Sequence, residues 1–128
     1  CPRVLIWSRP ESTAADRSCW IGDLSPGCEA VAYVERGWAE RLSSAHVFRY
    51  TLPAATFESI EDAGMFVSRQ AVCPAAVQRL SDLPAALEAA ATELRFVDDL
   101  ASLRGVWNSS LHASGIRLRN AARVSSPT

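Results

Sequence analysis

The sequence predicts an α+β fold, with a mixed, mostly antiparallel sheet of about six short strands and roughly three or four helices. Two observations predict it. Short apolar, β-prone runs are interspersed with stretches whose apolar residues have helical spacing. No linker or internal repeat divides the 128 residues, so we expect a single domain over residues 1–128. The hydrophobic share of 48% and the charged share of 21% are typical of a globular domain.

The predicted strands are short apolar runs that end at turn residues. Residues 3–7 and 29–35 are apolar and β-prone, as buried strands are. Residues 46–52 alternate apolar and polar side chains, and Pro53 ends this strand because proline cannot donate to a ladder. Further strands are expected over residues 64–68, 72–80, 94–97 and 115–119.

Two short helices are expected in the first third of the chain. Thr13 and Asp16 have the spacing of a capping box, with Asp in place of the usual Glu, and predict a helix that ends near residue 20. A second helix over residues 37–44 buries Trp38 and Leu42, which are four residues apart.

The later helices have clearer start signals. Ser81 is the expected N-cap of one helix, and Pro84 falls in its first turn, where proline is tolerated. The other begins at Asp98 and Asp99, whose carboxylates suit a helix N-terminus. Its expected apolar face consists of Leu100, Leu103, Trp107 and Leu111.

Charge and composition exclude several classes of function. The net charge of −1 and the pI of about 6.1 argue against a nucleic-acid or membrane-surface binder. No run reaches the roughly 18 apolar residues that a membrane span needs, and no signal peptide is recognisable, so we expect a cytoplasmic location. All 13 basic residues are Arg, which excludes chemistry that needs a catalytic Lys.

The cysteines and histidines do not predict a metal site. Cys1, Cys19, Cys28 and Cys73 include no C-x-x-C pair, and the chain has only two histidines. We therefore expect reduced thiols and no metal, with Cys19 and Cys28 as the first pair to test if the protein proves to be exported.

Arginines near the C-terminal end suggest an anion site. Residues 94–128 hold five Arg and two acids. If residues 115–119 form a strand, Arg117 and Arg119 lie on one face about 7 Å apart, where two guanidiniums can hold a phosphate or pyrophosphate. The alternative is that they face water or pair with acidic groups elsewhere on the surface. The other candidates for a nucleotide or anion cleft are Arg3, Tyr50, Ser68, Arg69 and Asn120.

Short segments along the chain occur in an order that resembles a known bacterial family. They are C-P-R-V at 1–4, F-R-Y-T-L-P at 48–53, V-S-R at 67–69, Val72 with Pro74 and Val77, D-L at 82–83, E-L-R at 93–95 and I-R-L-R-N-A at 116–121. The ordered set resembles domain-of-unknown-function family 6886 over nearly the whole chain.

The resemblance implies a further stretch of chain ahead of C-P-R-V. A strand predicted so close to Cys1 agrees with this, so we expect an N-terminally truncated fragment. The family has no assigned activity to carry over. The stretch ahead of C-P-R-V is similar to the NAD-binding half of ADP-ribosyltransferase-like folds, which implies half of a split sheet of that kind.

Two functions follow from these observations. The first is a small nucleotide- or NAD-handling domain, ADP-ribosyltransferase-like, with an arginine-lined site for an anionic ligand. The second is a non-catalytic binding or regulatory module. It predicts exposed apolar surface beside residues 4–7 and 31–34, where absent strands would have packed.

Overall fold

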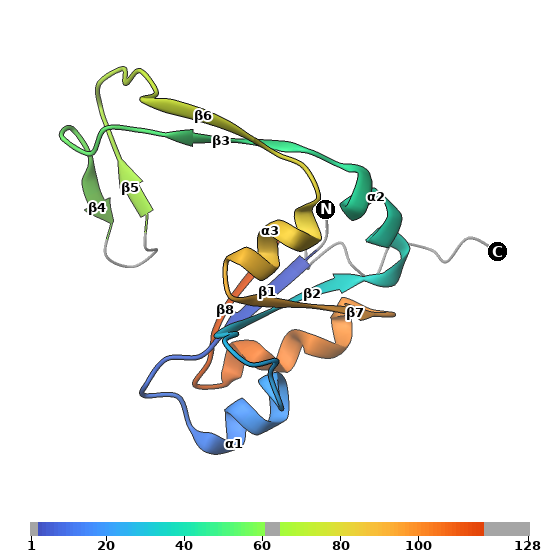
Figure 1. Ribbon diagram of the computed structural model, residues 1–128. Helices are drawn as coiled ribbons and strands as arrows, with labels where there is room; N and C mark the ends of the chain where they lie inside the picture. Colours follow the sequence, from blue (N-terminus) through green and yellow to red (C-terminus); the bar gives the residue numbers. More distant parts are fainter. Residues whose placement is uncertain (1–2, 61–64, 117–128) are drawn as a thin grey trace. The chain divides into compact units, whose positions relative to one another are not determined.

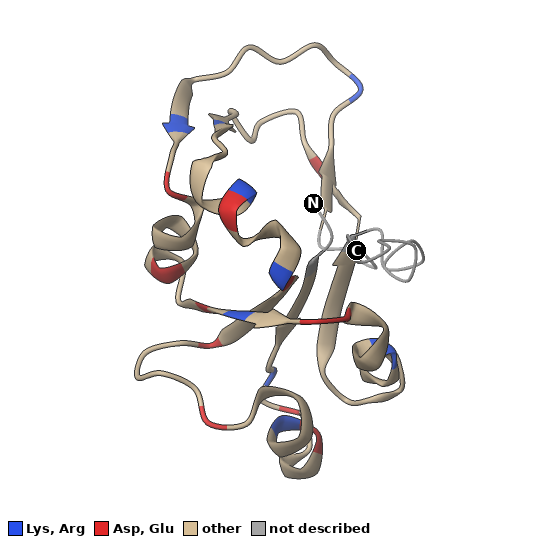
Figure 2. Cartoon of the chain, turned by 90° about the vertical axis from the view of Figure 1, so that its right-hand side faces the viewer, with Lys and Arg blue, Asp and Glu red and all other residues tan. Residues whose placement is uncertain are grey.

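The computed structural model describes residues 3–60 and 65–116, shown in Figure 1. The chain divides into two compact units. Unit 1 consists of Cys1–Ala45 and Asp82–Thr128, and unit 2 consists of His46–Ser81. Basic and acidic residues are interspersed along the described elements rather than gathered on one segment (Figure 2).

Unit 1 contains a four-stranded mixed sheet in the order β7-β2-β1-β8. Strand β1 (Arg3–Trp7) is antiparallel to both β2 (Ala30–Glu35) and β8 (His112–Ile116), and β2 is parallel to β7 (Thr92–Val97). The central strands are β2 and β1, which the apolar runs at 29–35 and 3–7 form. The strands expected at 3–7, 29–35 and 94–97 are confirmed.

The core of unit 1 lies on one face of this sheet. Val4 pairs with Tyr33 and Ile6 with Val31, so these four side chains share a face. Val4, Ile6 and Val31 are fully buried. They pack with four further apolar side chains from the helices and the turn before β8: Ile21, Leu100, Val106 and Leu111.

Strands β1 and β2 do not have the open edge that the binding-module hypothesis expected. Val4 and Ile6 have no exposed surface, and the four residues from Val31 to Val34 are at most 9% exposed. The expectation of exposed apolar surface beside these strands is therefore wrong. The physical reason is that β7 and β8 complete the sheet on either side of them.

The first helical segment has the expected capping box. Thr13 caps α1 (Ala14–Asp16), and its hydroxyl oxygen accepts from the Asp16 N–H at 3.1 Å. The chain continues as a π-helical turn, η1 (Arg17–Ile21), which Gly22 closes by donating its N–H to the Arg17 carbonyl at 2.8 Å. Gly22 has a φ of 60°, which favours glycine.

The next two helices are short. A 3₁₀ turn, η2 (Arg36–Trp38), leads into α2 (Ala39–Ser44), as expected, with Trp38 and Leu42 half-buried. Helix α3 (Leu83–Ala89) begins one residue later than expected. Asp82 rather than Ser81 is its N-cap, because the Asp82 carboxylate accepts from the Ala85 N–H at 3.2 Å.

The last helix, η3 (Leu100–Asn108), is 3₁₀ rather than α-helical. A 3₁₀ helix has three residues per turn, so Leu100, Leu103 and Val106 share the side that packs on the core. Trp107, expected on that side from α-helical spacing, is 47% exposed, so its predicted burial is wrong. Gly105 allows a close approach, because a Cβ there would lie 3.2 Å from the Trp20 ring.

Strand β8 begins earlier than expected. It spans His112–Ile116 and pairs with β1, so that Trp7 stacks on His112 with ring centroids 5.1 Å apart. The expected strand at 115–119 overlaps β8 at Gly115 and Ile116, and its remaining three positions lie outside the described residues. The expected arginine face of that strand lies outside the described residues.

Unit 2 contains two two-stranded antiparallel sheets. Strand β3 (Val47–Thr51) pairs with β6 (Ala76–Leu80), and β4 (Glu58–Ile60) pairs with β5 (Met65–Val67). The strands expected at 46–52 and 64–68 are confirmed, and the strand expected at 72–80 is confirmed only from Ala76 onward. Strand β4 was not predicted. Almost every residue of the four strands is exposed. The α+β class with mostly antiparallel pairing is confirmed, with eight strands rather than six among the described residues.

Two isoleucines of equal size test which unit carries the stability of the chain. We expect Ile6→Ala to lower the free energy of unfolding by about 2–5 kcal/mol, because it leaves a cavity in a packed core. The matched change Ile60→Ala, at a side chain 39% exposed in unit 2, should stay within about 0.5 kcal/mol of the unchanged protein when both are measured in dilute solution without a partner. Urea denaturation measures both. Equal losses would contradict this account of the core.

Candidate functional site

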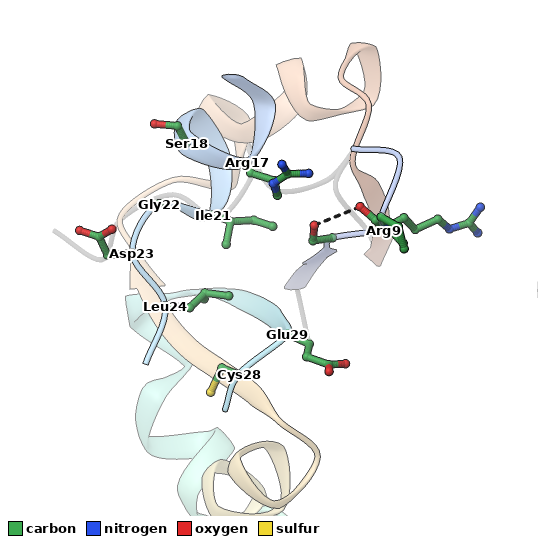
Figure 3. Close-up of a pocket in the computed structure, with 11 residues that line it drawn as sticks. Arg9, Arg17, Ser18, Ile21, Gly22, Asp23, Leu24, Cys28 and Glu29 are labelled. Atoms are coloured by element: carbon green, nitrogen blue, oxygen red, sulfur yellow. Dashed lines mark hydrogen bonds between the residues drawn. The ribbon is translucent and has the colours of Figure 1, made fainter. Parts of the chain in front are cut away.

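A hollow of about 850 Å³ opens on unit 1 between the turn after β1, the helical segment from α1 to η1, and the loop before β2. We call it the Arg17 hollow. Ile21 and Leu24 turn towards its interior, whereas Asp23 and Ser18 point outward (Figure 3). Ile21 is 3% exposed, so the hollow has an apolar floor below a polar rim.

Arg95 of β7 fixes the loop that forms one wall of this hollow. Its guanidinium donates to the carbonyls of Ile21 at 2.7 Å and Asp23 at 3.0 Å, and to the Tyr33 hydroxyl at 3.1 Å. The Tyr33 hydroxyl in turn donates to the Trp20 carbonyl at 2.6 Å. This guanidinium is occupied by backbone and side-chain acceptors, so its role is to hold the wall in place.

Glu93 extends the same network to the other end of the loop. Its carboxylate accepts from Arg95 at 2.6 Å, and from the Ser25 hydroxyl at 2.6 Å and N–H at 3.2 Å. The Ser25 hydroxyl, and then Arg95, lower the pKa of Glu93 because both donate to its charged form. Loop residues 20–25 are thus bonded to strands β2 and β7 at several points.

Asp16 fixes the opposite wall. One oxygen of its carboxylate accepts from the Thr13 hydroxyl at 2.7 Å and from the Ser110 N–H at 2.9 Å. Thr13 also donates its N–H to the Ser110 hydroxyl at 2.8 Å. The bonds from Ser110, and then from Thr13, lower the pKa of Asp16 from its ordinary value of 3.8. The start of α1 is thereby attached to a turn far along the chain.

Arg17, the residue after Asp16, places a cation at the hollow. Its guanidinium donates to the Ser12 carbonyl and is half-buried. Among the residues that the structure describes, Arg17 has no ion pair with an acid. Its other N–H groups are therefore available to an anionic group, while Ile21 and Leu24 offer apolar contact below it. Chemically, the hollow suits a small ligand with one anionic and one apolar part.

Unit 2 offers a different kind of surface on β3 and β6. Phe48 is paired with Arg79 and Tyr50 with Val77, so these four side chains share one face, which we call the ribbon face. Phe48, Tyr50 and Val77 are 52–57% exposed. The opposite face carries a polar pair, because Arg49 donates to the Gln78 side chain.

A second exposed apolar face lies on β4 and β5. Glu58 is paired with Val67 and Ile60 with Met65, so these side chains share what we call the hairpin face. Its three apolar side chains are 39–55% exposed. Neither face was predicted from the sequence, because alternation in residues 46–52 predicts a half-buried strand without showing what would cover it.

The residues predicted for an anion cleft fall in different parts of the chain. Arg3 begins β1 in unit 1, where only its backbone is described. Tyr50 lies on the ribbon face, and Ser68 bonds to Thr56 at 2.9 Å and to the Gln70 backbone, next to an exposed Arg69. Three more lie outside the described residues and stay predictions: Arg117, Arg119 and Asn120.

Neither a metal site nor a membrane helix is found in the described part of the chain. No group of three or more His, Cys, Asp or Glu side chains is arranged to hold a metal ion there. No described helix has the length and apolar character to cross a membrane. Cys19, Cys28 and Cys73 are free thiols, so the pair Cys19 and Cys28 is not bonded in this structure.

Comparison with known proteins identifies the family. The model of the family of unknown function DUF6886 matches residues 1–121. The chain belongs to this family. No curated protein matches, and no solved structure matches.

Membership in DUF6886 confirms the resemblance seen in the sequence, but it does not bear out the expected stretch ahead of C-P-R-V. The resemblance to ADP-ribosyltransferase-like folds is likewise not confirmed, because no solved structure matches. DUF6886 is a family of unknown function, so the match indicates no activity for this chain.

The Asp16 network predicts a pH dependence of stability. A carboxyl whose pKa is lowered on folding stabilises the protein above its ordinary pKa, and this contribution is lost as the pH falls through the folded value. We expect the stability difference between the unchanged protein and Asp16→Asn to be greatest at neutral pH and to shrink once the pH drops below 3.8. Urea denaturation across this range measures it.

A direct titration of Asp16 provides the control. Carboxyl NMR should give an Asp16 pKa below 3.8, and Ser110→Ala should raise it, because that variant removes the Ser110 hydroxyl, the largest cause of the lowering, while it keeps the Ser110 N–H. An Asp16 pKa at or above 3.8 in the unchanged protein would show that the network does not favour the charged form.

Proposed function

We propose that this DUF6886 chain is a protein-binding module that docks through the apolar faces of unit 2. One observation carries the proposal. Of the ten exposed large apolar side chains found in the described residues, nine lie in His46–Ser81, and the tenth is Trp107. Unit 2 holds only 32 of the 110 described residues, so exposed apolar surface is strongly concentrated there. Concentrated apolar surface of this kind marks interaction sites.

The composition of these faces supports docking to a protein. Interface cores are enriched in aromatic residues, Met and Arg relative to other surface. The ribbon face combines Phe48 and Tyr50 with Arg79, and the hairpin face includes Met65. The strands hold these side chains in a fixed register, so less conformational freedom is lost when a partner binds.

The stability of two-stranded sheets gives a second reason. An isolated two-stranded hairpin is only marginally stable in water, and a third strand or a packed face is needed for independent stability. The described part of unit 2 contains two such sheets, with exposed residues along β3, β4 and β5. A partner that covers the apolar faces would stabilise both sheets.

A second candidate function is the binding of a small anionic ligand such as a nucleotide or NAD. The Arg17 hollow favours it, because Arg17 offers guanidinium N–H groups above an apolar floor. This site uses different residues from the arginine pair predicted near the C-terminal end.

Site-specific photo-crosslinking tests the docking function. We expect p-benzoylphenylalanine in place of Tyr50 to give a discrete protein adduct when cells that produce the full chain are irradiated. The same replacement at Trp107, which is 47% exposed in unit 1, is the matched control and should give none. Denaturing gels and mass spectrometry identify the adducts. Absence of an adduct at Tyr50, in a protein with unchanged circular dichroism, would overturn the proposal.

Calorimetric titration tests the second candidate. ADP-ribose, NAD and inorganic phosphate are the probes. Loss of a charge-assisted hydrogen bond costs about 1.5–3 kcal/mol, so Arg17→Gln should weaken binding by roughly ten- to a hundredfold. Arg41→Gln on α2, whose guanidinium lies over the Trp38 ring, is the control and should bind like the unchanged protein. Absence of binding heat for all three probes would rule out this candidate.

A further inference from the structure

We propose that the protein that covers unit 2 is a second copy of this chain, in a two-fold symmetric dimer. The inference rests on the docking function proposed above. In this dimer the ribbon face of each copy packs on the hairpin face of its partner. Two-fold symmetry repeats this contact, so the ribbon face and the hairpin face of both copies are covered.

Complementary charge is the observation that favours a second copy. The ribbon face carries one charged side chain, Arg79, and the hairpin face carries one of opposite sign, Glu58. Each is next to apolar side chains, because Arg79 is paired with Phe48 and Glu58 with Val67. Among the residues that the structure describes, neither Arg79 nor Glu58 is in an ion pair. The two faces therefore differ in charge and match in apolar character.

The energetics of these two charges restrict what can cover the faces. A charge that loses water in an interface is destabilising unless an opposite charge is paired with it. A purely apolar partner would leave Arg79 and Glu58 without water and without partners. A second copy provides Glu58 for Arg79 and Arg79 for Glu58, and a guanidinium can bind a carboxylate through two hydrogen bonds.

Overall charge and the exposed apolar side chains of the two faces also permit self-association. Residues 46–81 contain three Arg and three acidic residues, so two copies of unit 2 carry no net charge that would repel them. The nine exposed large apolar side chains of unit 2 are 39–65% exposed. Six of the nine lie on the two faces, three on the ribbon face and three on the hairpin face, so a symmetric dimer covers all six in each copy.

Analytical ultracentrifugation of the full chain tests this inference. We expect a dimer, with about twice the 13.9 kDa mass of the chain. Arg79→Glu alone and Glu58→Arg alone should each weaken the dimer at least tenfold, because each places like charges opposite one another. The double variant with both changes should regain the affinity of the unchanged protein. Arg41→Glu on α2 is the matched control and should remain dimeric.

The outcomes distinguish this inference from the docking function. A monomer at 100 µM for the unchanged protein would overturn the dimer, whereas a Tyr50 adduct with a different protein would still support docking. A dimer whose affinity is unaffected by either single reversal would overturn the pairing of Arg79 with Glu58. Restoration in the double variant excludes misfolding as the cause of the single-variant losses.

Discussion

The pairing of β1 with neighbours on both sides is the constraint on which unit 1 depends. It brings residues 3–7, 30–35 and 112–116 into one sheet, although they are far apart in the sequence. Val4 and Ile6 then lie at the centre of a face that η1 and η3 cover. The same sheet positions Arg95 and Tyr33, which fix the loop at the Arg17 hollow. The core of unit 1 and the Arg17 hollow therefore both depend on this sheet.

Unit 2 has no comparable core among its described residues. Its strands alternate apolar and polar side chains as half-buried strands do, but their apolar sides are exposed. In unit 1, apolar surface is covered by the chain itself, whereas in unit 2 we propose that another protein covers it. Stability and binding are thus assigned to different parts of the chain.

Much of the fold could be predicted because its signals are local. The apolar runs at 3–7 and 29–35 and the capping box at Thr13 predict β1, β2 and α1 correctly. The position of β8 was harder to predict from the sequence, because Ala113, Ser114 and Gly115 have weak strand preference. Pairing with β1 determines where this strand lies. The burial of Val106 in place of Trp107 depends on η3 being 3₁₀, which α-helical spacing does not reveal.

The candidate sites depended more on long-range contacts and were harder to predict. Arg17 is one of 13 arginines, and only its position beside the bonds between Asp16 and Ser110 distinguishes it. The docking faces arise because no described segment of unit 2 covers β3 to β6, and this depends on pairings between distant residues rather than on local sequence. The predicted arginine pair near the C-terminal end remains a prediction.

Hydrogen exchange at two protein concentrations tests most directly whether unit 2 depends on a second copy of this chain for its stability. Amides of β1 and β2 should be equally protected at low and high concentration, because unit 1 has its own core. Amides of β3 and β6 should exchange rapidly in dilute protein and become protected as the concentration rises. Strong protection of β3 and β6 in dilute monomer, equal to that of β1 and β2, would contradict the account.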